Sequence, residues 1–183
     1  AKFLDRSGQA LRGVGADLAR VDTVDHTGLH PGLKDTEIQV ICDVTNPLTG
    51  PRGATAVYGP PKGASGEMLV RLERGMETYA AVMERALGRD FSHFPGAGAA
   101  GGMGAALGGV LGATLKPGID AVLDILGFER LLDGCQLVLT GEGRLDGQSV
   151  QYGKVPVGIA RRCAARGIPV IAIVGGIGDG ASG

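Results

Sequence analysis

The chain has 183 residues, of which 44% are hydrophobic and 20% are charged, enough to form one globular domain or one domain and part of another. Its 18 lysines and arginines nearly balance 19 aspartates and glutamates, and like charges do not cluster, which excludes a nucleic-acid or anionic-membrane surface. The sequence contains no apolar run of the ~20 residues that cross a bilayer and no recognisable secretory leader. We therefore expect a cytoplasmic protein, for which a small anionic ligand remains possible because such a ligand needs only two or three local cations.

Glycine is the unusual residue, with 34 copies in the chain, whereas the typical usage is about 7%. The glycines lie between patterned apolar segments, which favours tight turns and backbone-lined ligand loops over disorder. The cysteines Cys42, Cys135 and Cys163 have no Cys-x-x-Cys spacing. This argues against a zinc site or a disulfide framework and predicts three buried thiols.

Short strands are expected at the start of the chain, with residues 3–4 and 18–22 as candidate edge strands. Residues 38–44 are rich in β-branched side chains and predict a strand that stops before Asn46 and Pro47. A spacing of three to four between apolar residues predicts an amphipathic helix over 66–87. Ser65 is expected to cap its start, and Gly88 to end it. A second helix is predicted over 98–111, despite its glycines.

The last third of the chain predicts alternating helices and strands. Helices are expected over 118–126 and 155–165, and buried strands over 136–140 and 169–174. A strand, a helix and a second strand in this order predict a parallel pair with a right-handed crossover. The chain starts without a methionine and stops where the next helix of an alternating fold should begin, so we expect an internal segment of a longer protein. Because two parallel strands are not stable alone, either the early strands or segments outside this chain should complete the sheet.

Polar loops follow both predicted parallel strands, at the sheet edge where open α/β sheets bind ligands. The second loop, 175–180, is mostly glycine. The first loop, 141–154, offers metal ligands, cations for anions and a candidate base, and its glycines Gly141 and Gly143 free backbone N–H groups for phosphate. Its polar residues are Glu142, Arg144, Asp146, Gln148 and Lys154. A solvated polar loop without function is the alternative interpretation.

Another set of polar residues follows the strand predicted at 38–44. Asp43, Asn46 and Arg52 are suited to hold a hydroxy acid, with the Arg52 guanidinium paired to its carboxylate. Lys62 precedes a predicted helix N-terminus, where an anion is favoured. A simple chain reversal explains this proline- and glycine-rich segment equally well.

Two apparent nucleotide motifs fail a closer comparison. Residues 96–101 fit G-x-G-x-x-G and open a helix, but the preceding residues make a poor strand, so no dinucleotide site follows. Residues 147–154 resemble a Walker A loop that is one residue too long, and Val155 stands where Ser or Thr should hold magnesium. This near miss argues against a P-loop NTPase.

In their order along the chain, these motifs resemble the class I glycerate kinase family from about Phe3 to Gly178. The similar pieces are Cys42-Asp43-Val44 with Asn46-Pro47-Leu48, Gly50 and Arg52-Gly53-Ala54; Gly59-Pro60 with Lys62-Gly63-Ala64; Pro95 to Gly102; Thr140 to Arg144 with Asp146 and Gln148; and Gly153-Lys154-Val155-Pro156. Two departures stand out. Pro61 replaces a usual Gln, and the amino-terminal motifs of the family are absent, so this segment alone is not expected to turn over substrate.

The resemblance implies a two-domain α/β enzyme that phosphorylates D-glycerate with ATP and Mg²⁺ in a cleft between its domains. Residues 1–134 would form mainly the mixed α/β inserted domain, and residues 135–183 part of a parallel, Rossmann-like three-layer α/β/α domain. Glu142, Asp146 and Arg144 are expected to be catalytic, with Glu142 and Asp146 as metal ligands. The expected substrate contacts are Asp43, Asn46, Arg52, Lys62, Gln148 and Lys154, and the expected cofactor contacts are Gly96, Gly98, Gly101, Gly141 and Gly143.

Two other function classes stay open on the sequence. One is a phosphate- or nucleotide-binding module without catalysis, and the other is a nicotinamide-dependent dehydrogenase that rests on residues 96–101 alone. The sequence also does not decide whether the protein is a homodimer, or whether the 2- or the 3-hydroxyl of glycerate is phosphorylated.

Overall fold

The computed structural model describes residues 1–147 and 153–181. They fall into two compact units, Ala1–Leu115 and Lys116–Gly183. Helices and strands alternate, and one strand pair is parallel, which confirms the predicted α/β class. The units divide earlier in the chain than the domain boundary predicted after residue 134, so the segment 116–134 belongs to the second unit.

The first unit is built from short strands and five shorter helical segments around one long helix, α2. In chain order its elements are β1 (Lys2–Leu4), the 3-10 helix η1 (Gly15–Arg20), β2 (Thr23–Asp25), the 3-10 helix η2 (Pro31–Asp35), β3 (Gln39–Ile41), α1 (Ala54–Tyr58), the 3-10 helix η3 (Pro60–Lys62), α2 (Glu67–Leu87), α3 (Ala99–Val110) and β4 (Thr114–Lys116), which runs into the second unit. β1 pairs antiparallel with β2, and β3 pairs with β4.

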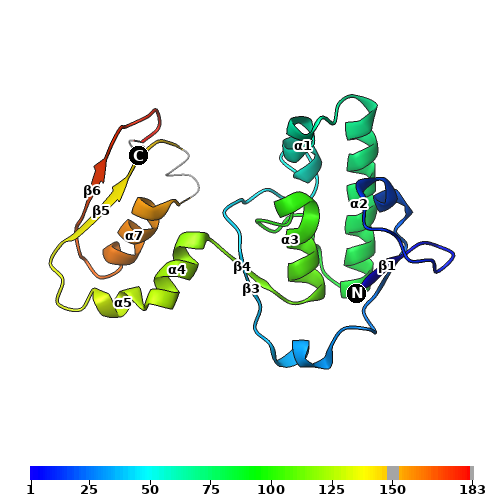
Figure 1. Ribbon diagram of the computed structural model, residues 1–183, viewed down its shortest axis with the longest axis horizontal. Coiled ribbons are helices and arrows are strands. Elements are labelled where there is room, and N and C mark those ends of the chain that lie inside the picture. Colours follow the sequence, from blue (N-terminus) through cyan, green and yellow to red (C-terminus); the bar gives the residue numbers. More distant parts are fainter. Residues whose placement is uncertain (148–152, 182–183) are drawn as a thin grey trace. The chain divides into compact units, whose positions relative to one another are not determined.

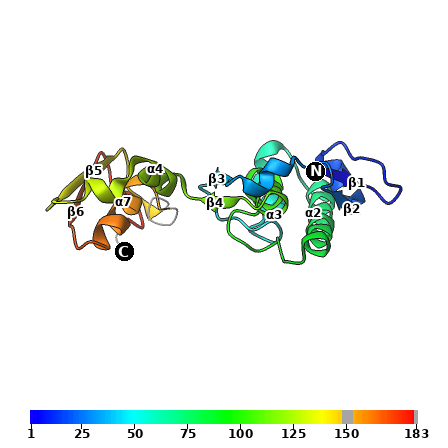
Figure 2. The ribbon, with the colours of Figure 1, turned by 90° about the horizontal axis from the view of Figure 1, so that it is seen from below.

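Helix α2 forms the centre of the first unit, with β1 and β2 beside it (Figures 1 and 2). Its apolar face buries Met76, Tyr79 and Met83 in a core that also includes Leu48 and Phe91 from the loops. The predicted helix 66–87 is confirmed, and so is its end at Gly88, which adopts the left-handed conformation. The predicted Ser65 cap is wrong, because Gly66 holds the cap position and no side chain bonds there.

Two further predictions in the first unit need correction. Residues 18–22 do not form an edge strand, because η1 covers most of them and β2 begins only at Thr23. The buried carboxylate of Asp17 accepts hydrogen bonds from Arg12 and Arg20 and fixes this turn through contacts that local propensity does not reveal. Helix α3 occupies the predicted place, but its backbone leaves the helical region at residues 100–102.

The second unit contains a βαβ arrangement preceded by two helices. Its elements are α4 (Gly118–Leu126), α5 (Phe128–Leu131), β5 (Val138–Glu142), α7 (Val155–Ala164) and β6 (Val170–Val174). β5 and β6 are parallel, in a register that runs from Val138 opposite Val170 to Glu142 opposite Val174, which confirms the predicted pair. α4 matches the helix predicted over 118–126.

Helix α7 is held to α4 and α5 by arginines along its last turns. Arg161 pairs with Asp120 at 2.6 Å and Arg162 with Asp124 at 2.7 Å, while Arg162 also pairs with Glu129. Cys163 is fully buried on the same helix. Cys135 is exposed and Cys42 partly buried, so the expectation of buried thiols is correct only for Cys163.

One face of the β5–β6 pair is left uncovered within the second unit. The exposed fractions of Leu139, Ile171 and Ile173 are 62%, 51% and 67%. These residues alternate with the partly buried side chains of Val138 and Thr140, and α7 packs against the pair. Among the described residues, no helix has the length and hydropathy needed to cross a bilayer.

Candidate functional site

The loop that follows β3 is shaped by the Asn46 side chain. Its amide nitrogen Nδ2 donates a hydrogen bond to the Arg52 carbonyl oxygen at 2.9 Å, and the Tyr58 hydroxyl donates to its Oδ1 at 2.9 Å. Leu48, fully buried between these points, anchors the loop in the core. Asn46 therefore closes residues 46–52 into a defined ring, and it keeps one N–H and one oxygen lone pair for a ligand.

Glu73 of α2 supports the same loop, and the sequence prediction missed it. Its Oε1 accepts a hydrogen bond from the backbone N–H of Gly50 at 2.6 Å, while its Oε2 is buried without a hydrogen-bond partner among the described residues. By helical periodicity Glu73 is one of several charged residues on the polar face of α2. Only the fold shows that this carboxylate faces a loop instead of solvent.

The loop before α3 packs directly against the loop after β3. The Gly98 N–H donates to the Asn46 carbonyl oxygen at 3.0 Å, and a Cβ at Gly98 would overlap the Pro47 carbonyl oxygen. Gly96 has a φ of +88°, and a Cβ there would lie 3.1 Å from Cys42 Sγ. The structure thus brings Gly98 next to Asn46 and Gly96 next to Cys42. Close backbone packing by itself explains why both positions are glycine.

Gly101 lies in a different environment from the other two glycines. Ala100, Gly101 and Gly102 have φ values of 50°, 76° and 104°, so three consecutive residues are left-handed at the start of α3. Gly101 lines a cavity of about 360 Å³ with Met76 and Tyr79. The cavity wall is mainly apolar, and burial raises the pKa of Tyr79 to about 12, so its hydroxyl remains neutral. Such a wall suits an apolar group better than a phosphate.

The remaining polar candidates of the first unit are exposed. Asp43 lies on the segment after β3, and Arg52 lies two residues before α1, next to its cap residue Gly53. Lys62 ends η3, beyond the other end of α1, so the short helix separates the two cations by its own length. Both side chains are exposed and able to reach an anion in solvent.

In the second unit, the loops after β5 and β6 continue the parallel pairing beyond the strands. The Leu145 N–H donates to the Gly176 carbonyl oxygen at 3.0 Å, and the Gly147 N–H donates to that of Asp179 at 2.9 Å. A Cβ at Gly175 would lie 2.7 Å from the Gly143 carbonyl oxygen. The two loops therefore form one backbone layer at the carboxyl edge, as the strand order predicts.

Arg144 and Asp146 extend from this layer on the same side, because they flank Leu145, which is bridged to Ile177. Both lie against the backbone of Gly178, where a Cβ would be 3.0 Å from the Arg144 guanidinium and from Asp146 Cβ. Glu142 is the last residue of β5 and is partly buried. Gln148, predicted as a substrate contact, lies outside the described residues.

Lys154 stands at the cap position of α7, and its side chain is exposed. The amino-terminal end of a ten-residue helix carries partial positive charge, and the lysine ammonium adds to it. Two positive groups at one place are favourable when an anion lies between them. The start of α7 therefore has the electrostatics of a phosphate or carboxylate site.

The donor set of the second unit fits magnesium better than zinc. Among the described residues, no group of three or more His, Cys, Asp or Glu side chains is placed to hold a metal. Mg²⁺ typically takes one or two protein carboxylates together with substrate phosphates and water. Asp146 and Glu142 could supply such carboxylates.

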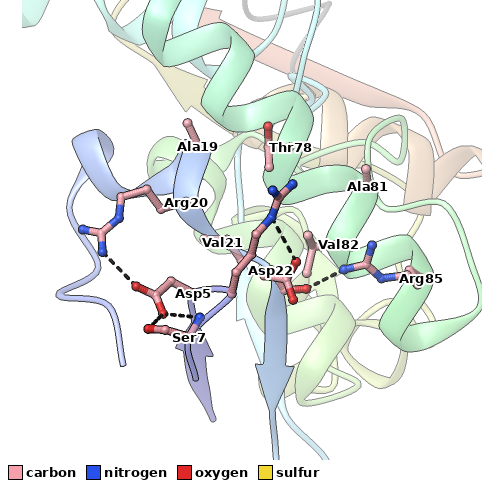
Figure 3. Close-up of a pocket in the computed structure, with 11 residues that line it drawn as sticks. Asp5, Ser7, Ala19, Arg20, Val21, Asp22, Thr78, Ala81, Val82 and Arg85 are labelled. Atoms are coloured by element: carbon pink, nitrogen blue, oxygen red, sulfur yellow. Dashed lines mark hydrogen bonds and ion pairs between the residues drawn. The ribbon is translucent and has the colours of Figure 1, made fainter. Parts of the chain in front are cut away.

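A prominent pocket of the first unit contains none of the predicted site residues. It has a volume of about 760 Å³ and lies between residues 5–7, η1 and α2 (Figure 3). Arg20 pairs there with Asp5 at 2.9 Å, and Arg85 donates to the Asp22 carbonyl oxygen. Because acceptors within the pocket already engage these guanidinium groups, it is a salt-bridged crevice.

Glycine-rich backbone loops with cations and carboxylates lie at the carboxyl end of parallel strands in this α/β chain, the edge at which open α/β sheets bind ligands. The chain belongs to the glycerate kinase family, whose model matches residues 1–183.

Individual relatives agree with this family assignment. The chain is 48% identical to glycerate 2-kinase of Escherichia coli K12, over 98% of this chain and 47% of the relative. It is 46% identical to glycerate kinase of Bacillus subtilis 168, over 96% of this chain and 46% of the relative. A crystal structure of a protein described as glycerate kinase 2 from Salmonella typhimurium LT2 covers 97% of this chain and 50% of its own, with a TM-score of 0.82 and 41% identity. The chain thus spans about half the length of these relatives.

Proposed function

We propose that the full-length protein transfers a phosphoryl group from ATP to D-glycerate and forms a phosphoglycerate, with Mg²⁺ as the metal. The main support is the family match along residues 1–183, together with two relatives, named as glycerate kinases, that align with nearly all of the chain. Phosphoryl transfer needs positioning and charge neutralisation more than covalent catalysis. Backbone loops with arginine, lysine and carboxylate side chains are suited to both tasks.

Within this proposal, Asp146 and Glu142 hold the metal or accept the proton of the glycerate hydroxyl as it attacks the phosphate. Arg144 and Lys154 pair with phosphate or carboxylate oxygens, and Gln148 contacts substrate. When bound, Mg²⁺ neutralises negative charge on the phosphates of ATP. Arg144 and Asp146 lie on the same side of the loop layer, which supports a shared role for them.

The first unit contributes a substrate wall in this proposal. Asp43 and Arg52 are the charged contacts, Asn46 uses its remaining amide N–H, and Lys62 attracts the anion. The proposed backbone contacts to nucleotide are Gly96, Gly98, Gly101, Gly141 and Gly143. We assign residues 1–134 mainly to the inserted domain and residues 135–183 to the parallel-sheet domain. The enzyme is proposed to be cytoplasmic and to form a homodimer.

The test is product analysis with the full-length protein. Incubation with D-glycerate, ATP and Mg²⁺ should yield a phosphoglycerate, and phosphorus NMR would identify the modified hydroxyl. Calorimetry should show binding of ATP and of D-glycerate. Binding of either ligand without turnover by the complete protein would instead favour a non-catalytic binding module. Light scattering would determine whether the protein is a dimer.

A further inference from the structure

The loop 175–180, which follows β6, contains no residue among the predicted site residues, yet it is bonded to the loop that does. The Gly178 N–H donates to the Leu145 carbonyl oxygen at 2.7 Å, and the Leu145 N–H donates to the Gly176 carbonyl oxygen at 3.0 Å. These two hydrogen bonds fix the position of Gly178 relative to Leu145. They thereby fix it relative to both neighbours of Leu145, Arg144 and Asp146.

Gly178 leaves little room for a side chain on the face that Arg144 and Asp146 occupy. A Cβ at this position would lie 3.0 Å from Nε and from a terminal nitrogen of Arg144, and 3.0 Å from Asp146 Cβ. Atoms of non-bonded groups normally meet at about 3.5–4.0 Å. Gly178 therefore gives both side chains a flat backbone surface at van der Waals distance.

The backbone conformation does not require glycine at this position. The φ of Gly178 lies outside the left-handed range, unlike that of Gly180 at +73°. What opposes a side chain at position 178 is therefore crowding against Arg144 and Asp146, and not backbone strain. The structural reason for this glycine lies in the two side chains proposed to act on phosphate and metal.

We propose that Gly178 is a positioning residue that holds the Arg144 guanidinium and the Asp146 carboxylate in their working orientation. This inference rests on the proposed kinase function of those two residues. An arginine has several rotatable bonds, so its head group needs a surface that restricts it before it can act with a defined geometry. A methyl group at position 178 would push the head group away by a few tenths of an ångström or more.

Gly176 provides a matched control on the same loop. A Cβ there would meet no atom within 4 Å, and its φ also lies outside the left-handed range. G176A adds the same methyl group, with the same change in chain entropy, two residues from Gly178. Any difference between G176A and G178A thus reports the contact with Arg144 and Asp146.

The experiment compares G178A, G176A, R144A and the double variant G178A/R144A in the full-length enzyme. We expect G178A to lower kcat/KM for glycerate about tenfold, and G176A to stay within about twofold of the wild type. In the R144A background, G178A should cause a much smaller further loss, because its main target is already gone. Thermal unfolding of each variant shows that the activities refer to folded enzyme.

A second readout is rescue of R144A by added guanidinium ion, which should be weaker in G178A/R144A because the methyl group fills part of the vacated space. Equal activities of G178A and G176A, with R144A strongly impaired, would overturn the inference and leave the proposed role of Arg144 intact. Full additivity of the two changes would overturn it as well. Wild-type activity of R144A would instead remove the role of Arg144, and the inference with it.

Discussion

Glu73 Oε1 accepts a hydrogen bond from the backbone N–H of Gly50 at 2.6 Å, although the two residues are 23 positions apart. Gly50 has a φ of +89° and lies in the ring closed by Asn46. Hydrogen bonds to a charged group stabilise by about 1.5–3 kcal/mol. We therefore expect E73A to loosen residues 46–52 and to raise the KM for glycerate about tenfold with a smaller change in kcat.

E73Q keeps an oxygen for the Gly50 N–H and should restore most of the loss caused by E73A. E77A is the matched control, because Glu77 is exposed one turn further along α2. Steady-state kinetics at varied glycerate concentration measures all three variants. An unchanged KM in folded E73A would show that the loop does not need this anchor.

The contact between Gly98 and Pro47 predicts a loss of stability in G98A. A Cβ at position 98 would overlap the Pro47 carbonyl oxygen, so backbone must move to admit it. Overpacking of this kind typically costs about 1–3 kcal/mol. Urea unfolding followed by far-UV circular dichroism should show a lower midpoint, and G28A should not, because a Cβ at Gly28 meets no atom within 4 Å. Equal urea midpoints for G98A and G28A would contradict the close contact between Gly98 and Pro47.

Asp120 predicts an acid-sensitive contact between α4 and α7. Burial acts to raise its pKa, but the hydrogen bonds and charges of Arg161 and Arg162 outweigh burial and hold the pKa below the usual value. A lowered pKa stabilises the fold above the unfolded-state pKa of about 3.9, and this stabilisation is lost as the pH falls toward the folded-state pKa.

We therefore expect the unfolding temperature of the wild type to drop below about pH 4 more steeply than that of D120N. At neutral pH, D120N should be the less stable of the two, because it loses the ion pairs with both arginines. D35N, a change of an exposed aspartate on η2, is the control. If the unfolding temperatures of the wild type and D120N fell in parallel as the pH is lowered, Asp120 would be excluded as the source of the acid sensitivity.

The proposed metal role of Asp146 predicts a changed magnesium requirement. D146N removes one negative charge from the two carboxylates proposed to hold the metal, and it keeps the side-chain shape. We expect the magnesium concentration for half-maximal activity to rise at least about tenfold, with excess magnesium restoring part of the rate. Activity titrations with Mg²⁺ at saturating ATP measure this. A wild-type titration curve for D146N would remove Asp146 from the metal site.

Elements with a strong local pattern were predictable from sequence. α2 follows an apolar stripe and ends at a left-handed glycine, and α4, β5, α7 and β6 lie within two residues of the predicted ranges. The prediction at 18–22 failed because the ion pairs of Asp17 with Arg12 and Arg20 stabilise a 3-10 turn there. The left-handed conformation at Ala100 was also not predictable from the sequence, since alanine normally favours a helix.

The candidate site was predictable in its position more than in its internal contacts. Strand order alone placed the loop with Arg144 and Asp146 at a carboxyl edge, and the structure joins it to loop 175–180. Glu73 and Gly178 were not predictable, because each acts through a partner distant in sequence. Gly96 and Gly98 resembled a nucleotide motif, yet a Cβ at Gly98 would meet the loop after β3, and a Cβ at Gly96 would meet Leu115 of β4 and then Cys42.

The uncovered face of the β5–β6 pair affects how the second unit behaves when it is produced without other polypeptide to cover it. Residues 170–174 are uncharged, apolar and mostly β-branched, and Ile171 and Ile173 are exposed. Segments with this composition and an unpaired strand edge are templates for intermolecular strand addition. Expressed alone, residues 116–183 should therefore aggregate at concentrations at which the full-length protein stays soluble. The same exposed stretch is open to strand addition during synthesis.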